Sequence, residues 1–252
     1  MRELLLIGIG TGNPDHVTVE AVEALNRAEV FFVVDKGERK SGLLALRDEI
    51  CRRHIRDQDG YRVVEIPDPP RDRDPATGEA YQDAVEGWHD ARARLFADAI
   101  AAELGEDGVG AFLVWGDPSL YDSTLRVVDR ILALGTVRFD YRVIAGVTSV
   151  QALTAAHRIP LNRIGEQIVI TPARQLTPDV TNAVVMLDRG FTAAGYDGLD
   201  VYWGAYLGSP DEVTIAGPLP EVGPQIERAR AELRERHGWI MDSYLLRRRV
   251  VE

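Results

Sequence analysis

The sequence predicts an α/β protein that contains two sheets. Apolar runs of strand length alternate with amphipathic segments of helix length along most of the 252 residues, which is typical of α/β folds. Several of these runs end in glycine-rich turns, as parallel strands do where a crossover begins. In the last third the runs follow one another with little helix between them, which favours antiparallel pairs. We therefore expect a mainly parallel sheet in residues 1–118 and a mixed sheet in residues 119–252.

The individual elements follow from periodicity and from turn residues. Leu4–Ile7 and Val30–Val34 predict buried strands, and Thr18, a good N-cap residue, predicts the start of a helix between them. The proline-rich residues 67–78 predict a loop. The other expected strands are 63–66, 112–115, 142–145, 167–171, 183–187, 201–207, 213–216 and 239–246. The other expected helices cover 43–50, 85–99, 125–132, 149–157 and 222–233.

The first glycine-rich turn, Gly8–Pro14, lies in a context like that of a dinucleotide-binding fold. A strand, this turn, a helix and a second strand that ends at Asp35 follow in the order of that fold. However, Asn13 and Pro14 stand where the third glycine of the fingerprint belongs, and that glycine lets helix and strand pack closely. An NAD-dependent oxidoreductase is therefore an alternative that the sequence disfavours.

Composition excludes several classes of protein. A net charge of −11 argues against a nucleic-acid partner, because phosphate contacts need a basic face. No apolar run has the length of a membrane span, and the N-terminal apolar stretch lacks a signal-peptide cleavage site. The single cysteine, Cys51, allows no internal disulfide and fits a cytoplasmic protein. The histidines show no metal-ligand spacing, so we expect no metal.

Three glycine-rich turns, each at the end of an expected strand, carry the functional signal. They are GIGTGNP at 8–14, GDPSLYDST at 116–124 and IAGVTSVQA at 144–152, and VVMLD at 184–188 and YLGSPDE at 206–212 follow them. In this order and spacing the motifs resemble the tetrapyrrole methylase family over nearly the whole chain. Longer blocks such as GAFLVWGDPSLYDSTLRVVDR are similar to the members that act on precorrin-5 in aerobic cobalamin biosynthesis.

The resemblance implies a two-domain, class III methyltransferase-like fold with the active site in the interdomain cleft, and a homodimer. It implies transfer of a methyl group from S-adenosyl-L-methionine to C-1 of precorrin-5, with release of acetate and of S-adenosyl-L-homocysteine. Another precorrin methyltransferase or a diphthine synthase could share the same turns, and a non-catalytic ligand-binding module is a further alternative. The cofactor contacts that the resemblance implies are Gly10, Thr11, Gly116, Asp117, Leu120, Thr148, Ser149, Leu187, Ala205 and Gly208.

This sequence departs from the family pattern at two of these turns. Thr11 and Asn13 replace a proline and an aspartate in the first turn, and Trp115 replaces a small residue before Gly116. A sulfonium methyl group is already activated, so the methyl transfer needs positioning rather than a protein nucleophile. Deacetylation does need water to attack a carbonyl, and a general base would help. Tyr121 and Asp122 are the catalytic candidates, with Asp188 and His157 as further polar side chains, and each also has an ordinary structural interpretation.

A precorrin carries many carboxylates, so an acidic protein needs cations where it binds one. Lys36 and Lys40 follow the strand that ends at Asp35, and they precede the helix around 43–50. Arg126 lies one turn into the helix after GDPSLYDST, and Arg158 follows the helix 149–157. We expect these four residues to bind the substrate, although each one alone could equally be solvated surface charge.

Overall fold

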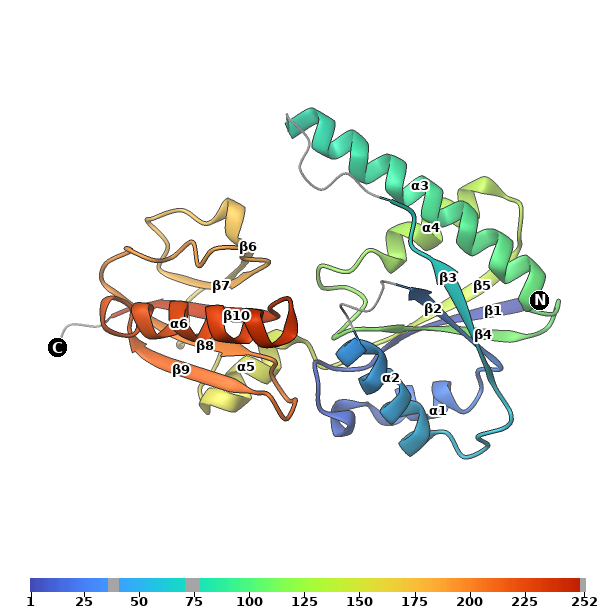
Figure 1. The fold of residues 1–252 in the computed structure, drawn as a ribbon, viewed down its shortest axis with the longest axis horizontal. Helices are drawn as coiled ribbons and strands as arrows, with labels where there is room; N and C mark the ends of the chain where they lie inside the picture. Colours follow the sequence, from blue (N-terminus) through green and yellow to red (C-terminus); the bar gives the residue numbers. More distant parts are fainter. Residues whose placement is uncertain (36–40, 71–77, 250–252) are drawn as a thin grey trace. The chain divides into compact units, whose positions relative to one another are not determined.

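The computed structural model in Figure 1 describes residues 1–35, 41–70 and 78–249, which form two compact units. The first unit contains Met1–Gly10 and Pro14–Val147, and the second contains Thr11–Asn13 and Thr148–Glu252. Each unit has one five-stranded sheet. The first sheet is entirely parallel and the second is mixed, which confirms the fold class expected from the sequence.

The sheet of the first unit has the strand order β3-β2-β4-β1-β5. Alternate residues of β1 face two different cores: Leu4 and Leu6 pack with α3 and α4, whereas Leu5 and Ile7 pack with α1 and α2. The unit is therefore an α/β/α sandwich, as Figure 1 shows. Its strands are β1 (Arg2–Gly8), β2 (Val30–Asp35), β3 (Arg62–Pro67), β4 (Val109–Val114) and β5 (Phe139–Ile144). Its helices are η1 (Pro14–His16), α1 (Val19–Leu25), α2 (Ser41–His54), α3 (Gly78–Glu103) and α4 (Thr124–Leu134).

The second unit has the strand order β6-β7-β10-β8-β9. β6 and β7 are parallel, and the other three pairings are antiparallel. Trp203 and Tyr244 are fully buried in its core. The strands are β6 (Val169–Pro172), β7 (Asn182–Met186), β8 (Leu199–Ala205), β9 (Val213–Pro218) and β10 (Asp242–Arg248). The helices are α5 (Ser149–His157), η3 (Ala173–Gln175) and α6 (Leu219–His237).

The grouping of residues into units differs from the boundary expected after Pro118. β5 pairs with β1 along its whole length, and α4 packs beside α3, so residues 119–147 group with the first sheet. The final strand also begins later than expected, at Asp242 rather than Trp239. In the part of the chain that the structure describes, no helix is both long and apolar enough to cross a membrane.

The first helix begins where its cap residue predicts. Thr18 Oγ1 accepts a hydrogen bond from the Ala21 backbone N at 3.1 Å, and α1 starts at Val19. The short 3-10 helix η1 separates the glycine-rich turn from α1, so α1 does not follow the glycines directly. A dinucleotide fold needs a helix whose N-terminus directly follows the glycines and faces the pyrophosphate. This geometry is a second reason, besides the missing glycine, to set the oxidoreductase alternative aside.

Candidate active site

The carboxyl ends of β1 and β4 form the topological switch point of the first sheet. These two strands are neighbours, and their chains leave toward opposite faces: β1 continues to α1, whereas β4 continues to α4. Ligands of open α/β sheets bind at such a point. Here the two turns pair through their backbones, since Gly116 N donates to Gly10 O at 2.8 Å and Gly10 N donates to Gly116 O at 3.2 Å.

Three glycines let the ends of β1, β4 and β5 approach one another through bare backbone. A Cβ on Gly8 would come within 2.6 Å of Gly146 N. A Cβ on Gly146 would come within 2.1 Å of Gly116 O, a distance that no side chain tolerates. The predicted turns therefore converge in the first unit, and the surface that they build there is made of peptide groups rather than side chains.

The Asp117 carboxylate links the turn after β4 to the turn after β5 by hydrogen bonds. Its Oδ1 accepts from Ser119 N at 2.8 Å and from Ser119 Oγ, and its Oδ2 accepts from Gly146 N at 2.8 Å. Burial raises the pKa of Asp117, but the hydrogen bonds from Ser119 and Gly146 outweigh this effect and leave the pKa below its usual value. Asp117 is thus an ionised residue that shapes the turn, and most of its acceptor capacity is already used.

Both catalytic candidates in the GDPSLYDST turn also have structural roles in that turn. Tyr121 has a positive φ of 53° and an exposed side chain. Asp122 Oδ1 accepts from Thr124 N at 2.6 Å, which satisfies a free N–H in the first turn of α4. The predicted substrate residue Arg126 is exposed and donates to the Asp122 carbonyl oxygen at 3.3 Å. Tyr121, Asp122 and Arg126 therefore lie at or next to the same turn. Their roles in catalysis and substrate binding stay predictions.

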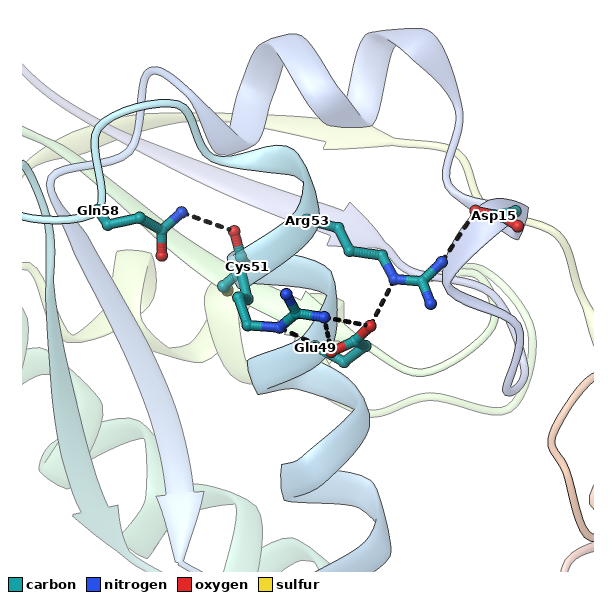
Figure 2. Close-up of polar contacts among 6 residues, drawn as sticks. Asp15, Glu49, Cys51, Arg53 and Gln58 are labelled. Atoms are coloured by element: carbon teal, nitrogen blue, oxygen red, sulfur yellow. Dashed lines mark hydrogen bonds and ion pairs between the residues drawn. The ribbon is translucent and has the colours of Figure 1, made fainter.

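Helix α2 holds the segment that follows the first glycine turn (Figure 2). Arg53 donates to Glu49 on the same helix and, through Nη1, to Asp15 Oδ1 at 3.3 Å. One residue further on, His54 Nε2 lies 3.1 Å from the Pro14 carbonyl oxygen. These contacts connect η1 to α2. Exposed ion pairs of this kind contribute roughly 0–1 kcal/mol, so they orient the segment more than they stabilise it.

In the second unit, the start of α5 lies beside the end of β7. Thr148 is the N-cap of α5, and its Oγ1 accepts from Val150 N at 3.1 Å. Ser149 Oγ lies 3.9 Å from the sulfur of Met186, the last residue of β7. The next residue, Leu187, has a positive φ of 56°, and its side chain is 57% exposed. Strained backbone conformations of this kind cluster at functional sites.

The remaining predicted cofactor residues of this unit meet at the turn after β8. A Cβ on Gly12 would lie 2.8 Å from Leu207 O and 2.9 Å from Ser209 N, so the segment Thr11–Asn13 packs closely against that turn. Gly208 belongs to the same turn, while Ala205 is fully buried at the end of β8. The Thr11 hydroxyl is buried and has no hydrogen-bond partner among the described residues.

Asp188 is the centre of a buried polar network in the second unit. Its oxygens accept from Gly190 N at 3.0 Å, from Thr192 N at 2.6 Å and Oγ1 at 3.0 Å, and from Tyr244 OH at 2.6 Å. Burial raises the pKa of Asp188, but the hydrogen bonds, with that of Tyr244 first, hold it below its usual value. A carboxylate saturated in this way is a poor general base, so its structural interpretation is the better supported one.

Arg230 extends this network to a second carboxylate. Its Nη2 donates to the Asp188 carbonyl oxygen at 2.6 Å, and its Nη1 lies 3.0 Å from Asp242 Oδ2. Burial raises the pKa of Asp242, and the Arg230 charge opposes that effect. His157 is bonded elsewhere, since its Nε2 lies 3.0 Å from the Trp203 carbonyl oxygen, and burial lowers its pKa. Neither arrangement points to the deacetylation chemistry.

Of the four predicted basic residues, Arg126 lies in the first unit and Arg158 in the second. Lys36 and Lys40 lie outside the described residues, so their role stays a prediction. Arg158 is the exposed αL residue that caps α5 and has a φ of 57°. Two arginines that the sequence reasoning missed, Arg47 and Arg92, lie near the GDPSLYDST turn instead. Arg92 occupies the apolar stripe of α3, four residues from both Trp88 and Phe96, and that position was the signal available in the sequence.

Arg92 contacts side chains from three elements. Its guanidinium carbon lies 4.4 Å from the centre of the Trp88 ring, and its Nε lies 3.2 Å from Asp68 Oδ1. Its Nη1 donates to Ser123 Oγ at 3.4 Å, so this side chain connects α3, the end of β3 and the start of α4. Among the described residues, no three His, Cys, Asp or Glu side chains gather closely enough to hold a metal ion.

Comparison with known proteins agrees with this geometry. Residues 3–223 match the family model of the tetrapyrrole (corrin/porphyrin) methylases. The deacetylating precorrin-6A synthase of a Sinorhizobium species is 47% identical, over 98% of this chain and 96% of its own. A crystal structure of a cobalamin synthesis related protein, CobF, from Corynebacterium diphtheriae is 40% identical and superposes with a TM-score of 0.84, covering 98% of this chain and 99% of that one.

A more distant structure shows the same fold with a nucleoside ligand. It is a uroporphyrin-III C-methyl transferase from Thermus thermophilus, complexed with S-adenosylhomocysteine. It is 20% identical, covers 97% of each chain and has a TM-score of 0.55. At this identity the likeness concerns the fold alone.

Proposed function

Because this chain belongs to the tetrapyrrole (corrin/porphyrin) methylase family, we propose that it is a C-methyltransferase of cobalamin biosynthesis that acts on precorrin-5. It transfers a methyl group from S-adenosylmethionine to C-1, releases the acetyl group as acetate and yields precorrin-6A. The observation that carries this proposal is the near-full-length likeness to the deacetylating precorrin-6A synthase. Another precorrin methyltransferase of the family is the alternative closest in chemistry.

Each unit contains residues whose properties fit S-adenosylmethionine. The buried Thr11 hydroxyl without a described partner is an unused hydrogen-bonding group, and the glycines let backbone approach a ligand closely. Leu187 offers an exposed apolar side chain for a flat nucleoside. The residues proposed to hold the cofactor are Gly10, Gly116, Asp117 and Leu120 in the first unit, and Thr11, Thr148, Ser149, Leu187, Ala205 and Gly208 in the second.

The protein contributes mainly positioning to the methyl transfer. When bound, S-adenosylmethionine supplies a methyl group that its sulfonium already activates. The backbone turns fixed by Gly8, Gly146 and Asp117 are rigid supports for such a ligand. Alignment of two bound reactants can supply roughly 7–11 kcal/mol of a barrier, so methyl transfer needs no nucleophilic triad.

Deacetylation requires a proton acceptor and a water molecule. Water attacks the acetyl carbonyl, the bond between ring carbon and acetyl group breaks, and its electron pair stays on the macrocycle while acetate leaves. The ring carbon that keeps this pair is then nucleophilic toward a methyl group. Tyr121 and Asp122 are the proposed groups for this step because they lie in the turn that follows the cofactor residues Gly116 and Asp117. Asp188 is not proposed, since its oxygens accept four hydrogen bonds.

We also expect a cytoplasmic homodimer, with neither nucleic acid nor membrane as a partner. The net charge of −11 supports the expectation for nucleic acid. The dimer is a proposal from the resemblance, and light scattering at working concentration tests it. A monomer at that concentration would remove it.

Calorimetric titration and isotope transfer test the function itself. S-adenosylhomocysteine should bind the purified chain, and methyl-labelled S-adenosylmethionine should label precorrin-5 in its presence. A chain that binds the nucleoside but transfers no label, with any precorrin offered, would instead be a ligand-binding module. Reduction of NAD in place of methyl transfer would restore the oxidoreductase alternative.

A further inference from the structure

Arg47, on α2, reaches the end of the first sheet between β2 and β4. Its Nη2 donates to the Leu113 carbonyl oxygen at 3.1 Å. That carbonyl is available because β2 pairs with β4 only at Val30–Gly110 and Phe31–Ala111. Val114 O accepts from Ile9 on the β1 side, so Leu113, one residue earlier, points its carbonyl toward β2. The Arg47 guanidinium therefore lies near the carboxyl edge of the sheet. The residue that it contacts there, Leu113, precedes Gly116 by three positions.

The charge of Arg47 is not neutralised by a contacting carboxylate among the described residues. Its Nε is buried without a hydrogen-bond partner there, and the ion pairs of the described chain do not include it. Two fully buried arginines do have such partners: Arg92 lies 3.2 Å from Asp68, and Arg230 lies 3.0 Å from Asp242. A third, Arg247, donates to two backbone carbonyl oxygens, those of Pro160 and Leu161, whereas Arg47 has one such bond. Burial lowers the pKa of Arg47, and Asp122 is the charge that most opposes this effect.

Keeping an unpaired guanidinium partly out of water is costly. Burial of a charge destabilises the folded state unless a counter-charge or a full set of hydrogen bonds compensates for it. A single bond to a backbone carbonyl leaves most of the five donors of an arginine unused. An anionic ligand that arrives at this edge would supply the missing partner, and the fork of the guanidinium matches a carboxylate in two parallel hydrogen bonds.

We propose that Arg47 receives a carboxylate of the tetrapyrrole substrate. The inference rests on the proposed function, because that function brings a ligand with acetate and propionate side chains to the carboxyl edge of this sheet. The α-carboxylate of the cofactor has the same chemistry. We commit to the tetrapyrrole because an acidic protein must offset long-range repulsion of a polyanion with cations at the site itself.

Binding measurements with stable probes test the proposal. The probes are uroporphyrin III, which carries acetates and propionates, coproporphyrin III, in which methyl groups replace the acetates, and S-adenosylhomocysteine. Arg47→Met should weaken uroporphyrin III binding about tenfold, the effect of one charged hydrogen-bonded contact. Arg47→Lys keeps the charge without the fork and should lose about threefold. Coproporphyrin III shows whether Arg47 contacts an acetate or a propionate. If the contact is a propionate, Arg47→Met should weaken coproporphyrin III binding as much as uroporphyrin III binding; if it is an acetate, coproporphyrin III binding should not change.

Arg52→Met is the matched control. Arg52 lies on the same helix, is exposed and pairs with Glu49, so its loss should leave porphyrin affinity unchanged. The melting temperature of Arg47→Met should stay close to that of the wild type, because methionine fills a similar volume and removes an unpaired charge. Salt screens both the long-range repulsion and the contact at Arg47, so the comparison between variants is the test: added salt should lower the porphyrin affinity of the wild type relative to that of Arg47→Met.

The possible failures can be told apart. If Arg47→Met binds uroporphyrin III as the wild type does, the inference is wrong and the proposed function is untouched. If Arg47→Met instead loses affinity for S-adenosylhomocysteine alone, the carboxylate at Arg47 belongs to the cofactor and the inference is equally overturned. If the wild type binds neither porphyrin but labels precorrin-5, the inference is overturned and the proposed function stands. If it also fails to label precorrin-5, both fail.

Discussion

The Asp117 carboxylate accepts a hydrogen bond from the backbone N of Gly146 at 2.8 Å. These residues follow β4 and β5, which are not neighbours in the sheet but flank β1 on either side. One side chain thus spans the end of the central strand and fixes the turns on both sides of it. A short polar side chain reaches that far only because Gly8 and Gly146 have no Cβ to separate the strand ends.

Removing this carboxylate should loosen the turns and weaken nucleoside binding. Asp117→Ala leaves the Ser119 and Gly146 N–H groups without their acceptor, which costs about 1–3 kcal/mol of the free energy of unfolding. S-adenosylhomocysteine affinity should fall in the same variant, because the surface that we propose for the ligand is built by these turns. Urea unfolding and calorimetry measure the two effects. A folded Asp117→Ala chain with unchanged stability and unchanged affinity would refute both roles.

The depressed pKa of Asp117 gives its contribution a defined pH dependence. The pKa of Asp117 is near 3.8 in the unfolded state and lies below that value in the folded state. The stabilisation is therefore fully present above about pH 4 and is lost as the pH falls through the folded-state pKa. The difference in unfolding free energy between the wild type and Asp117→Asn should therefore shrink as the pH is lowered below about 4. A difference that stays constant from pH 7 to strongly acid solution would show that ionisation of Asp117 does not stabilise the turn.

Gly146 should tolerate no side chain. Gly146→Ala places a Cβ 2.1 Å from Gly116 O and 2.8 Å from Gly8 Cα, and all of these atoms are backbone. Relief requires the strand ends to move apart, so we expect a loss of several kcal/mol of stability, at least about 3. Gly87→Ala in α3 is the control: nothing lies within 4 Å of its added Cβ, and alanine should raise stability by about 0.5–1 kcal/mol. Thermal unfolding that ranks the two variants equally would argue against the close packing.

The Asp188 network should matter for stability rather than for proton transfer. Tyr244→Phe removes one of its donors, at a cost of about 1–2 kcal/mol. Asp188→Ala strands the Tyr244 hydroxyl and the Thr192 and Gly190 N–H groups, and should cost about 3 kcal/mol or more. Tyr202→Phe on the neighbouring β8 is the matched control, since that side chain is only half-buried. A pH–rate profile of deacetylation that changes in folded Tyr244→Phe would return Asp188 to the list of catalytic candidates.

The sequence predicted most of the fold because local signals agreed with the final packing. The strand around Leu4–Ile7, the N-cap at Thr18 and the mixed character of the second sheet are all as expected. Residues 119–147 group with the first sheet, whereas the sequence placed them with the second domain, because the pairing of β5 with β1 is long-range and no local signal shows it. Glycine-rich turns indicated the strand ends that we propose as the site, but not that the Asp117 oxygens would be used within the protein.

Side-chain partners were the hardest feature to foresee. Exposed basic residues such as Arg126 stood out in the sequence beside the motif, whereas Arg47 and Arg92 are spaced like ordinary helix residues. Only the arrangement of α2 and α3 around the sheet shows that these two side chains reach its carboxyl end. The buried network of Asp188, Arg230 and Asp242 joins residues that lie far apart in the sequence, and it has no motif of its own.

The most direct test of the central claim measures methyl transfer and acetate release in one reaction. The purified chain is incubated with precorrin-5 and methyl-labelled S-adenosylmethionine. Mass spectrometry then measures the mass of the tetrapyrrole product, and the free acetate is quantified. We expect a product that has gained the labelled methyl group and lost the acetyl group, with one acetate released for each methyl transferred. A labelled product that retains its acetyl group, or acetate release without label, would contradict it.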